Sequence, residues 1–192
     1  MKILFSYKTE EERDYAAEKL AAHEIIFHQG PLQTGEWSGG GVETVCIFVN
    51  SPVGETELAR LPDLKLIATR STGYDHIDLA RARARNITVV NVPAYGEHTV
   101  AEFAFALLLA VTRHICLANE RVVRGGAFSP EGLTGSDLFG KTVGVIGTGR
   151  IGKNFIRIAH GFGLKILAVD GFPDQEYART EGFNYQPIDD IL

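Results

Sequence analysis

Residues 142–170 decide the fold of this chain, and they read TVGVIGTGRIGKNFIRIAHGFGLKILAVD. The apolar run from Val143 to Ile146 predicts a buried strand, and the glycines after it predict a tight turn. A helix and a second strand are expected next, and Asp170 ends that strand about 20 residues after the glycines. This order of elements predicts a dinucleotide-binding βαβ unit: a strand, a G-x-G-x-x-G turn, a helix, a second strand and an acidic residue.

Each glycine of the motif has a predicted role. Gly147 permits the tight turn, Gly149 lets the backbone approach a pyrophosphate, and Gly152 lets the helix press against the strand. The backbone N–H groups of Arg150 and Ile151 would then face the phosphates at the positive end of the helix dipole. The Arg150 side chain either adds a charged contact or is only a solvated residue at the start of the helix.

Asp170 predicts the choice of cofactor. A carboxylate at the end of the second strand accepts hydrogen bonds from the adenosine ribose hydroxyls, and it repels the 2′-phosphate of NADP. Gly171 and Phe172, which follow, offer no cation for that phosphate. We therefore expect NAD. The alternative is an ordinary βαβ unit that happens to contain a glycine turn.

Composition narrows the class of protein. The chain has 192 residues, 45% of them apolar, so a core can be buried. Its net charge is −5 and it has no Lys/Arg run, so nucleic acid is not an expected partner.

Cys46 and Cys116 lie in apolar surroundings and are interpreted as buried thiols. No signal peptide is visible, and the apolar run from Phe103 to Val111 is too short to span a bilayer. A cytoplasmic protein without membrane association is the expectation.

The order of elements predicts an α/β fold, with flavodoxin-like or Rossmann doubly wound parallel sheets. Residues up to about 92 alternate strand and helix, with a strand expected at 64–69 and a helix capped by Asp78. A single helix is expected from His98 to Val123, apolar nearly all round, and therefore buried between layers or subunits. We place a substrate domain at residues 1–97 and a dinucleotide-binding domain at 98–192.

The second domain is expected to be incomplete. Its sheet has two clear strands and a possible short third one at Asn184 and Tyr185, whereas a full dinucleotide fold has about six. The last residues, from Pro187 to Leu192, resemble a helix start with an Asp at its cap, and one turn does not stand alone. The sequence thus predicts the first half of this domain only.

These residues resemble the D-isomer-specific 2-hydroxyacid dehydrogenases, and most closely their D-lactate dehydrogenase branch. The segments that carry the resemblance lie at residues 45–50, 70–78, 92–95, 100–102 and 128–152. The tyrosine at position 95 and the loop from Phe128 to Leu133 indicate the lactate branch. The resemblance implies an active site in the cleft between two domains, and a homodimer formed through the helix at 98–123.

The resemblance also assigns site residues. The Thr72–Gly73 turn matches the backbone that holds the substrate carboxylate, although a plain strand-to-helix turn is the alternative. Tyr95 matches a tyrosine that contacts the substrate, although it could be an ordinary loop aromatic. The family's catalytic arginine, glutamate and histidine lie beyond Leu192 in its pattern, so no catalytic residue is assigned in this chain. His76, His98 and His114 do not match the catalytic histidine, and only His98, near Tyr95, is of interest.

The expected function is therefore NAD-dependent interconversion of a small 2-oxo acid and the corresponding D-2-hydroxy acid. Pyruvate is the expected 2-oxo acid. The 192 residues alone are expected to be inactive, since ketone reduction needs a proton donor and a cation near the oxo group. The alternative is a non-catalytic NAD(H)-binding protein used in assembly or regulation, or an inactive fragment of the same fold. Asp75 and Asp78 lack further ligands nearby, so no metal is expected.

Overall fold

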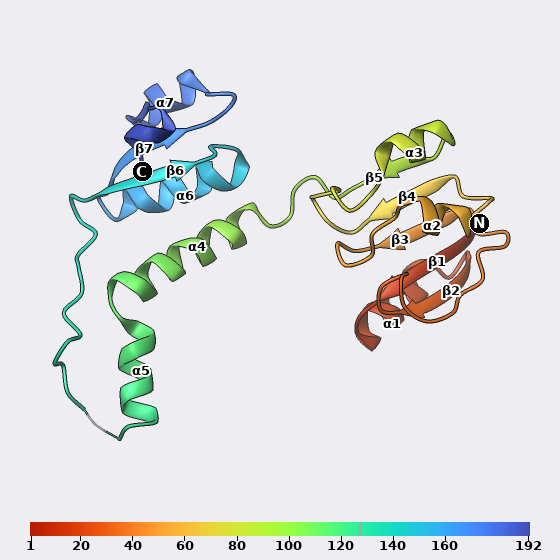
Figure 1. Cartoon of the computed structure of the whole chain (residues 1–192), viewed down its shortest axis with the longest axis horizontal. Coiled ribbons are helices and arrows are strands. Elements are labelled where there is room, and N and C mark those ends of the chain that lie inside the picture. Colours follow the sequence, from red (N-terminus) through yellow and green to blue (C-terminus); the bar gives the residue numbers. More distant parts are fainter. Residues whose placement is uncertain (127) are drawn as a thin grey trace. The chain divides into compact units, whose positions relative to one another are not determined.

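A computed structural model of the chain describes residues 1–126 and 128–192 (Figure 1). The chain divides into two compact units, Met1–Tyr95 and Gly96–Leu192. Each unit contains a parallel sheet with helices packed on it. The α/β class with doubly wound, Rossmann-like sheets, which the sequence predicts, is confirmed.

The first unit is built on a five-stranded parallel sheet with the strand order β2-β1-β3-β4-β5. Its strands are β1 (Lys2–Tyr7), β2 (Glu24–Gln29), β3 (Thr44–Ile47), β4 (Leu66–Thr69) and β5 (Thr88–Val90). Strand β2 is added on one side of β1, and β3, β4 and β5 are added in turn on the other side. Parallel crossovers are right-handed, so helices that join strands in opposite directions cover opposite faces of the sheet.

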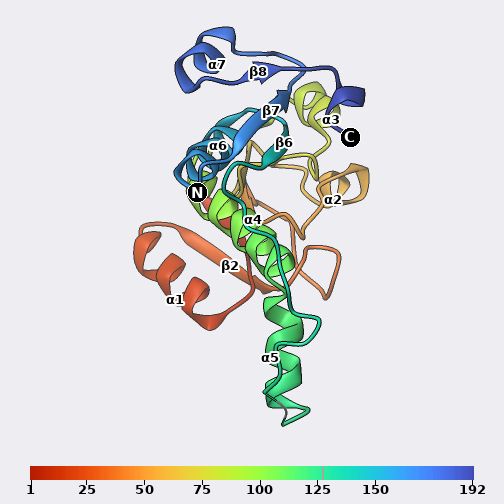
Figure 2. The same cartoon turned by 90° about the vertical axis from the view of Figure 1, so that its left-hand side faces the viewer.

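Three helices provide these crossovers, namely α1 (Glu10–Lys19), α2 (Glu55–Ala59) and α3 (Leu79–Ala84). Figure 2 shows α1 well apart from α2 and α3, as the handedness rule requires. The predicted cap at Asp78 is confirmed, since its side chain accepts a hydrogen bond of 3.0 Å from the Arg81 N–H. Because both faces are covered, apolar side chains are buried on both. Val45, Ile47 and Ile67 are fully buried on one face, and Ile3 and Phe5 are buried on the other.

The second unit contains a three-stranded parallel sheet in the order β6-β7-β8. Its strands are β6 (Thr142–Ile146), β7 (Lys165–Val169) and β8 (Asn184–Tyr185), and helices α6 (Arg150–Gly161) and α7 (Gln175–Glu181) connect them. The short third strand is thus confirmed. A 3₁₀ turn at Ile188–Asp190 follows Pro187, so the expected Asp cap at this point is wrong.

The helix expected from His98 to Val123 is two helices, α4 (Glu97–Thr112) and α5 (Ile115–Val123), with a 65° bend between them. His114 stands at the bend in the left-handed conformation, with φ 53°, which ends one helix before the next begins. No glycine or proline marks the break, so it could not be predicted from the sequence. In the described part of the chain no single helix could cross a membrane; α4 and α5 meet the length and composition criteria only when taken as one bent pair.

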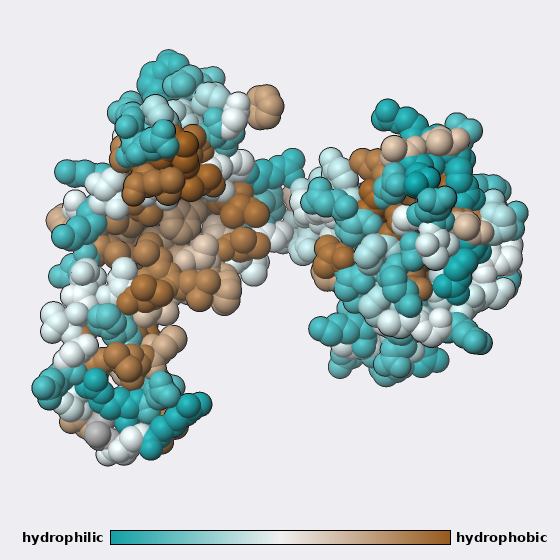
Figure 3. All heavy atoms as spheres, in the orientation of Figure 1, coloured by the Kyte–Doolittle hydropathy of each residue, from teal (hydrophilic) through white to brown (hydrophobic). Residues whose placement is uncertain are grey.

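Helix α4 is only partly buried in its own unit. Phe105 is buried, with its ring centroid 4.6 Å from that of Phe162, at the C-terminal end of α6. Other apolar side chains of α4 remain exposed, namely Val100, Phe103, Leu107 and Val111. Figure 3 shows apolar residues gathered over this unit. The apolar side chains around α4 are therefore not all buried within this unit, although burial on nearly all sides was expected.

The two cysteines differ from the expectation of buried thiols. Cys46, in β3, is half-buried, and burial raises the pKa of its thiol. Cys116, in α5, is exposed. All residues of this helix are described, and none of them is buried. The expectation is therefore wrong for Cys116.

Candidate functional site

The glycine turn joins β6 to α6 and lies against the end of β7. Gly147 has φ +92°, a conformation that side chains rarely adopt, and its N–H donates to the Val169 carbonyl over 2.8 Å. A Cβ added at Gly152 would lie 2.0 Å from the Gly147 carbonyl oxygen. Helix and turn therefore meet at a distance that only glycine allows, as the motif predicts.

Gly149 differs from these two glycines. It precedes α6 with φ −65°, which any residue can adopt, and a Cβ added there would meet nothing within 4 Å. The protein itself thus has no steric need for glycine at this position. The open space lies at the N-terminus of a 12-residue helix, where the N–H groups of Arg150 and Ile151 begin the first turn. A pyrophosphate fits this arrangement, because backbone donors and the helix dipole both favour an anion.

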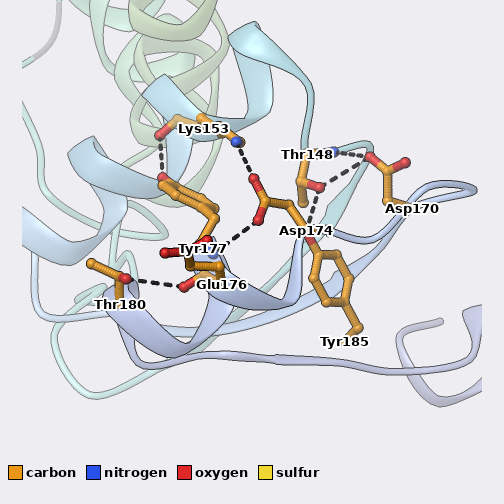
Figure 4. A network of polar contacts seen from close by, with 8 residues as sticks. All are labelled: Thr148, Lys153, Asp170, Asp174, Glu176, Tyr177, Thr180 and Tyr185. Carbon is orange, nitrogen blue, oxygen red and sulfur yellow. Dashed lines mark hydrogen bonds and ion pairs between the residues drawn. The ribbon is translucent and has the colours of Figure 1, made fainter.

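Asp170 follows β7 and is bonded directly to the glycine turn (Figure 4). Its Oδ2 accepts from the Thr148 N–H over 2.6 Å and from the Thr148 hydroxyl over 3.0 Å, and its Oδ1 accepts from the Phe172 N–H over 2.8 Å. The backbone N–H of Phe172 and then the two donors of Thr148 hold the pKa of this carboxyl below its usual value. The carboxylate is therefore ionised beside the turn, and it keeps lone pairs for further donors.

Two further contacts fix the start of α7 against α6 (Figure 4). Lys153 Nζ lies 2.6 Å from Asp174 Oδ2, and the Tyr177 hydroxyl donates to the Lys153 carbonyl over 3.1 Å. Asp174 also caps α7 by accepting from the Tyr177 N–H over 3.0 Å. The Lys153 ammonium lowers the pKa of the Asp174 carboxyl. Sequence reasoning missed these residues, although an Asp directly before a helical segment is a signal for a cap.

The Thr72–Gly73 turn follows β4 in the first unit, and both residues are exposed. The bonds that hold this turn use its carbonyl groups. Asn91 Nδ2 donates to the Thr72 carbonyl over 2.8 Å, and the Ser71 hydroxyl donates to the Gly73 carbonyl over 2.7 Å. The N–H groups of the turn take no part in these contacts, which suits them to bind a carboxylate.

A chain of polar side chains lies beneath this turn. Ser71 uses its only hydrogen on the Gly73 carbonyl, so the Thr69 hydroxyl, 2.6 Å away, donates to Ser71 Oγ. Thr69 Oγ1 in turn accepts from His76 Nε2 over 3.1 Å, which assigns the proton of the neutral imidazole to Nε2. Burial lowers the pKa of His76, with the Asp75 carboxylate acting in the opposite direction. Thr69 and Ser71 are buried members that the sequence did not single out.

The remaining candidate residues stand apart from these contacts. Tyr95 lies in the loop between β5 and α4 and is 62% exposed. His98 is exposed in the first turn of α4, and His114 lies at the α4–α5 bend. Within residues 1–126 and 128–192, no three His, Cys, Asp or Glu side chains are grouped so that they could hold a metal ion.

The fold and the glycine turn define an α/β protein with a Rossmann-like βαβ unit. The chain belongs to the D-isomer specific 2-hydroxyacid dehydrogenases, since residues 3–178 match the sequence profile of the catalytic domain of that family. The resemblance of the sequence to this family is thus confirmed.

Individual relatives are similar over most of the chain. A "2-hydroxyacid dehydrogenase homolog" of Zymomonas mobilis is 42% identical over 175 residues, which are 88% of this chain and 52% of the relative. The D-lactate dehydrogenase of Escherichia coli is 44% identical over 138 residues, 71% of this chain and 42% of that enzyme. The chain spans about half the length of the curated relatives that it matches.

Solved structures agree with this assignment. The D-lactate dehydrogenase of Aquifex aeolicus, complexed with NAD and lactic acid, aligns with a TM-score of 0.90 and 30% identity, covering 99% of this chain and 57% of that one. The pyruvate reductase of Chlamydomonas reinhardtii aligns with a TM-score of 0.82 and 33% identity, covering 100% and 58%.

Proposed function

We propose that this protein is an NAD-dependent oxidoreductase that interconverts a small 2-oxo acid and the D-2-hydroxy acid, with pyruvate and D-lactate as the pair. The observation that carries the proposal is the Asp170 carboxylate, ionised and bonded to Thr148 of the glycine turn. An ionised acid beside a helix start with open backbone donors is the arrangement that NAD recognition requires, and this supports the proposal.

The residues of this chain would divide the work of binding between the two units. The open backbone at Gly149 and the first N–H groups of α6 would hold the pyrophosphate, and Asp170 would accept from the adenosine ribose. The N–H groups of Thr72 and Gly73 would hold the carboxylate of the 2-oxo acid, and Tyr95 would contact the rest of the substrate. NAD supplies the hydride chemistry when it is bound, and the protein supplies orientation and charge.

The substrate is assigned from the relatives. The E. coli and Aquifex D-lactate dehydrogenases support lactate, and the Chlamydomonas pyruvate reductase supports pyruvate. A glyoxylate reductase of Korarchaeum cryptofilum is also similar, with 36% identity over 149 residues. Glyoxylate is therefore the main competitor of pyruvate, and the size of the 2-substituent is the property to be tested.

The proposal includes a homodimer formed through α4 and α5. Phe103 is 66% exposed and Leu107 52% exposed on α4, and Ile115 is 52% exposed on α5. Exposed apolar side chains of this size on consecutive helices mark a surface that buries itself against a partner. A second copy of the chain is the occupant that we propose, in line with the resemblance to the family.

The experiment is a substrate panel on the purified protein, in the longest form that its gene encodes. NADH consumption is followed with pyruvate, glyoxylate, hydroxypyruvate and 2-oxobutyrate, and kcat/KM is compared. The proposal predicts turnover with pyruvate preferred over glyoxylate. Preference for glyoxylate would replace the substrate, and tight NADH binding without turnover of any 2-oxo acid would favour the non-catalytic alternative.

A further inference from the structure

The hydroxyl of Tyr185 is the meeting point of three segments around the proposed cofactor site. It lies 2.7 Å from Thr148 Oγ1 in the glycine turn, and it accepts from the Asp174 N–H over 3.2 Å at the start of α7 (Figure 4). Thr148 is bonded to Asp170, at the end of β7. Tyr185 itself comes from β8, so one side chain is bonded directly to the glycine turn and to the start of α7, and through Thr148 to the end of β7.

The direction of this hydrogen-bond chain follows from counting hydrogens. An ionised carboxylate only accepts, so the single hydrogen of the Thr148 hydroxyl points to Asp170 Oδ2. Thr148 Oγ1 must then accept from Tyr185, whose hydroxyl donates to it. The order is Tyr185 O–H to Thr148 O–H to the Asp170 carboxylate. Thr148 is only 3% exposed, so its hydroxyl, in the middle of this chain, is shielded from competing water.

We infer that Tyr185 and Thr148 are positioning residues for cofactor selection, because they hold the Asp170 carboxylate in the charged, fixed orientation that distinguishes NAD from NADP. The inference rests on the proposed function. Neither residue needs to touch the dinucleotide for this role. They act through the one group whose charge attracts the ribose hydroxyls and repels a 2′-phosphate.

Charge and orientation both matter for this discrimination. The Phe172 N–H holds Oδ1, and the two donors of Thr148 hold Oδ2, so the carboxylate cannot rotate without breaking bonds. Without the hydroxyl chain, the Thr148 N–H alone would hold Oδ2. The carboxylate would then rotate more easily and take up a proton at higher pH, and both changes weaken NAD binding more than NADP binding.

The test compares NAD and NADP dissociation constants, by calorimetry on the full protein, for Thr148→Val and Tyr185→Phe. Thr148→Val keeps the shape of the side chain but removes the hydroxyl, and Thr148→Ser restores it. Tyr177→Phe is the matched control, because it removes a hydroxyl between α6 and α7 that bonds to Lys153 and not to Asp170.

The expected result for Thr148→Val is an NAD dissociation constant about ten-fold higher, with a much smaller change for NADP. Tyr185→Phe should shift the NAD-to-NADP preference in the same direction by about three-fold, as a bond one step removed. The pH at which NAD affinity falls on acidification should rise in Thr148→Val. Thr148→Ser and Tyr177→Phe should keep the wild-type preference.

The outcomes separate this inference from the proposed function. A wild-type protein without affinity for NAD would overturn the proposed function. A wild type that prefers NAD, together with Thr148→Val and Tyr185→Phe variants that keep this preference, would overturn the inference alone. Equal weakening of NAD and NADP would also overturn it, because that pattern indicates a structural role. If Thr148→Val does not fold, Tyr185→Phe decides by the same ratio.

Discussion

Replacing Gly149 by valine should separate cofactor binding from folding. The backbone at Gly149 has φ −65° and ψ −165°, an extended conformation in which valine is unstrained, and a Cβ would meet no atom of the protein within 4 Å. We expect Gly149→Val to change the melting temperature by less than about 3 °C, which corresponds to less than about 1 kcal/mol for a chain of this size.

Binding should respond very differently. A pyrophosphate approaches the backbone donors to about 2.9 Å, and the valine side chain would occupy that space. Loss of two charge-assisted hydrogen bonds, at about 1.5–3 kcal/mol each, amounts to about 3–6 kcal/mol. The NAD dissociation constant should therefore rise by a factor of about 10² to 10⁴.

The assay is titration calorimetry with NADH, combined with thermal unfolding of the same samples. Gly152→Ala is the contrasting variant, because its Cβ would lie 2.0 Å from the Gly147 carbonyl and the fold must shift. It should lose about 1–3 kcal/mol of folding stability. A folded Gly149→Val protein with the NADH affinity of the wild type would refute the assignment of this turn to the pyrophosphate.

Four further results are expected. Asp170→Ala should weaken NAD binding far more than NADP binding in titration calorimetry. Because the folded pKa of Asp170 is lowered, its contribution in the wild type should be present at neutral pH and lost only as pH falls below the usual value of about 3.9. For His76 the lowered pKa means that stability is lost as pH falls through about 6.5, so the wild type should lose more melting temperature between pH 7.5 and 5.5 than His76→Gln, which keeps a donor for Thr69. At the α4–α5 bend, His114→Val should cost about 1–2 kcal/mol in thermal unfolding, because a β-branched residue resists positive φ, whereas His114→Asn should be neutral. Phe103→Glu should turn a dimer into a monomer in sedimentation velocity, and a dimer that survives this change would place the interface elsewhere.

The local features of the second unit were predictable because they depend on short-range rules. The glycines, the apolar strand and Asp170 each occupy a position that backbone geometry dictates, and the structure places Asp170 against the turn as the spacing implies. The bend at His114 was not predictable, since the left-handed residue is neither glycine nor asparagine. Nothing in the sequence marks the partners of Asp170 as such. Tyr185 reaches Thr148 across 37 positions of sequence, and only the β7–β8 pairing brings them together.

The buried polar chain beneath the Thr72–Gly73 turn illustrates the same limit. The turn was identified from the resemblance and from its place at the end of β4. Its support by Ser71, Thr69 and His76 depends on side-chain geometry, which local patterns do not encode. A histidine in a loop gave no indication of a partner.

The most direct test of the central claim is the chirality of the product. The purified protein, in the longest form that its gene encodes, is incubated with NADH and pyruvate, and the lactate formed is resolved on a chiral column and compared with the NADH consumed. We predict one D-lactate per NADH, with NADPH a much poorer donor. L-lactate as the product, or binding of NADH without any lactate, would contradict the proposal that this protein is an NAD-dependent D-2-hydroxyacid dehydrogenase.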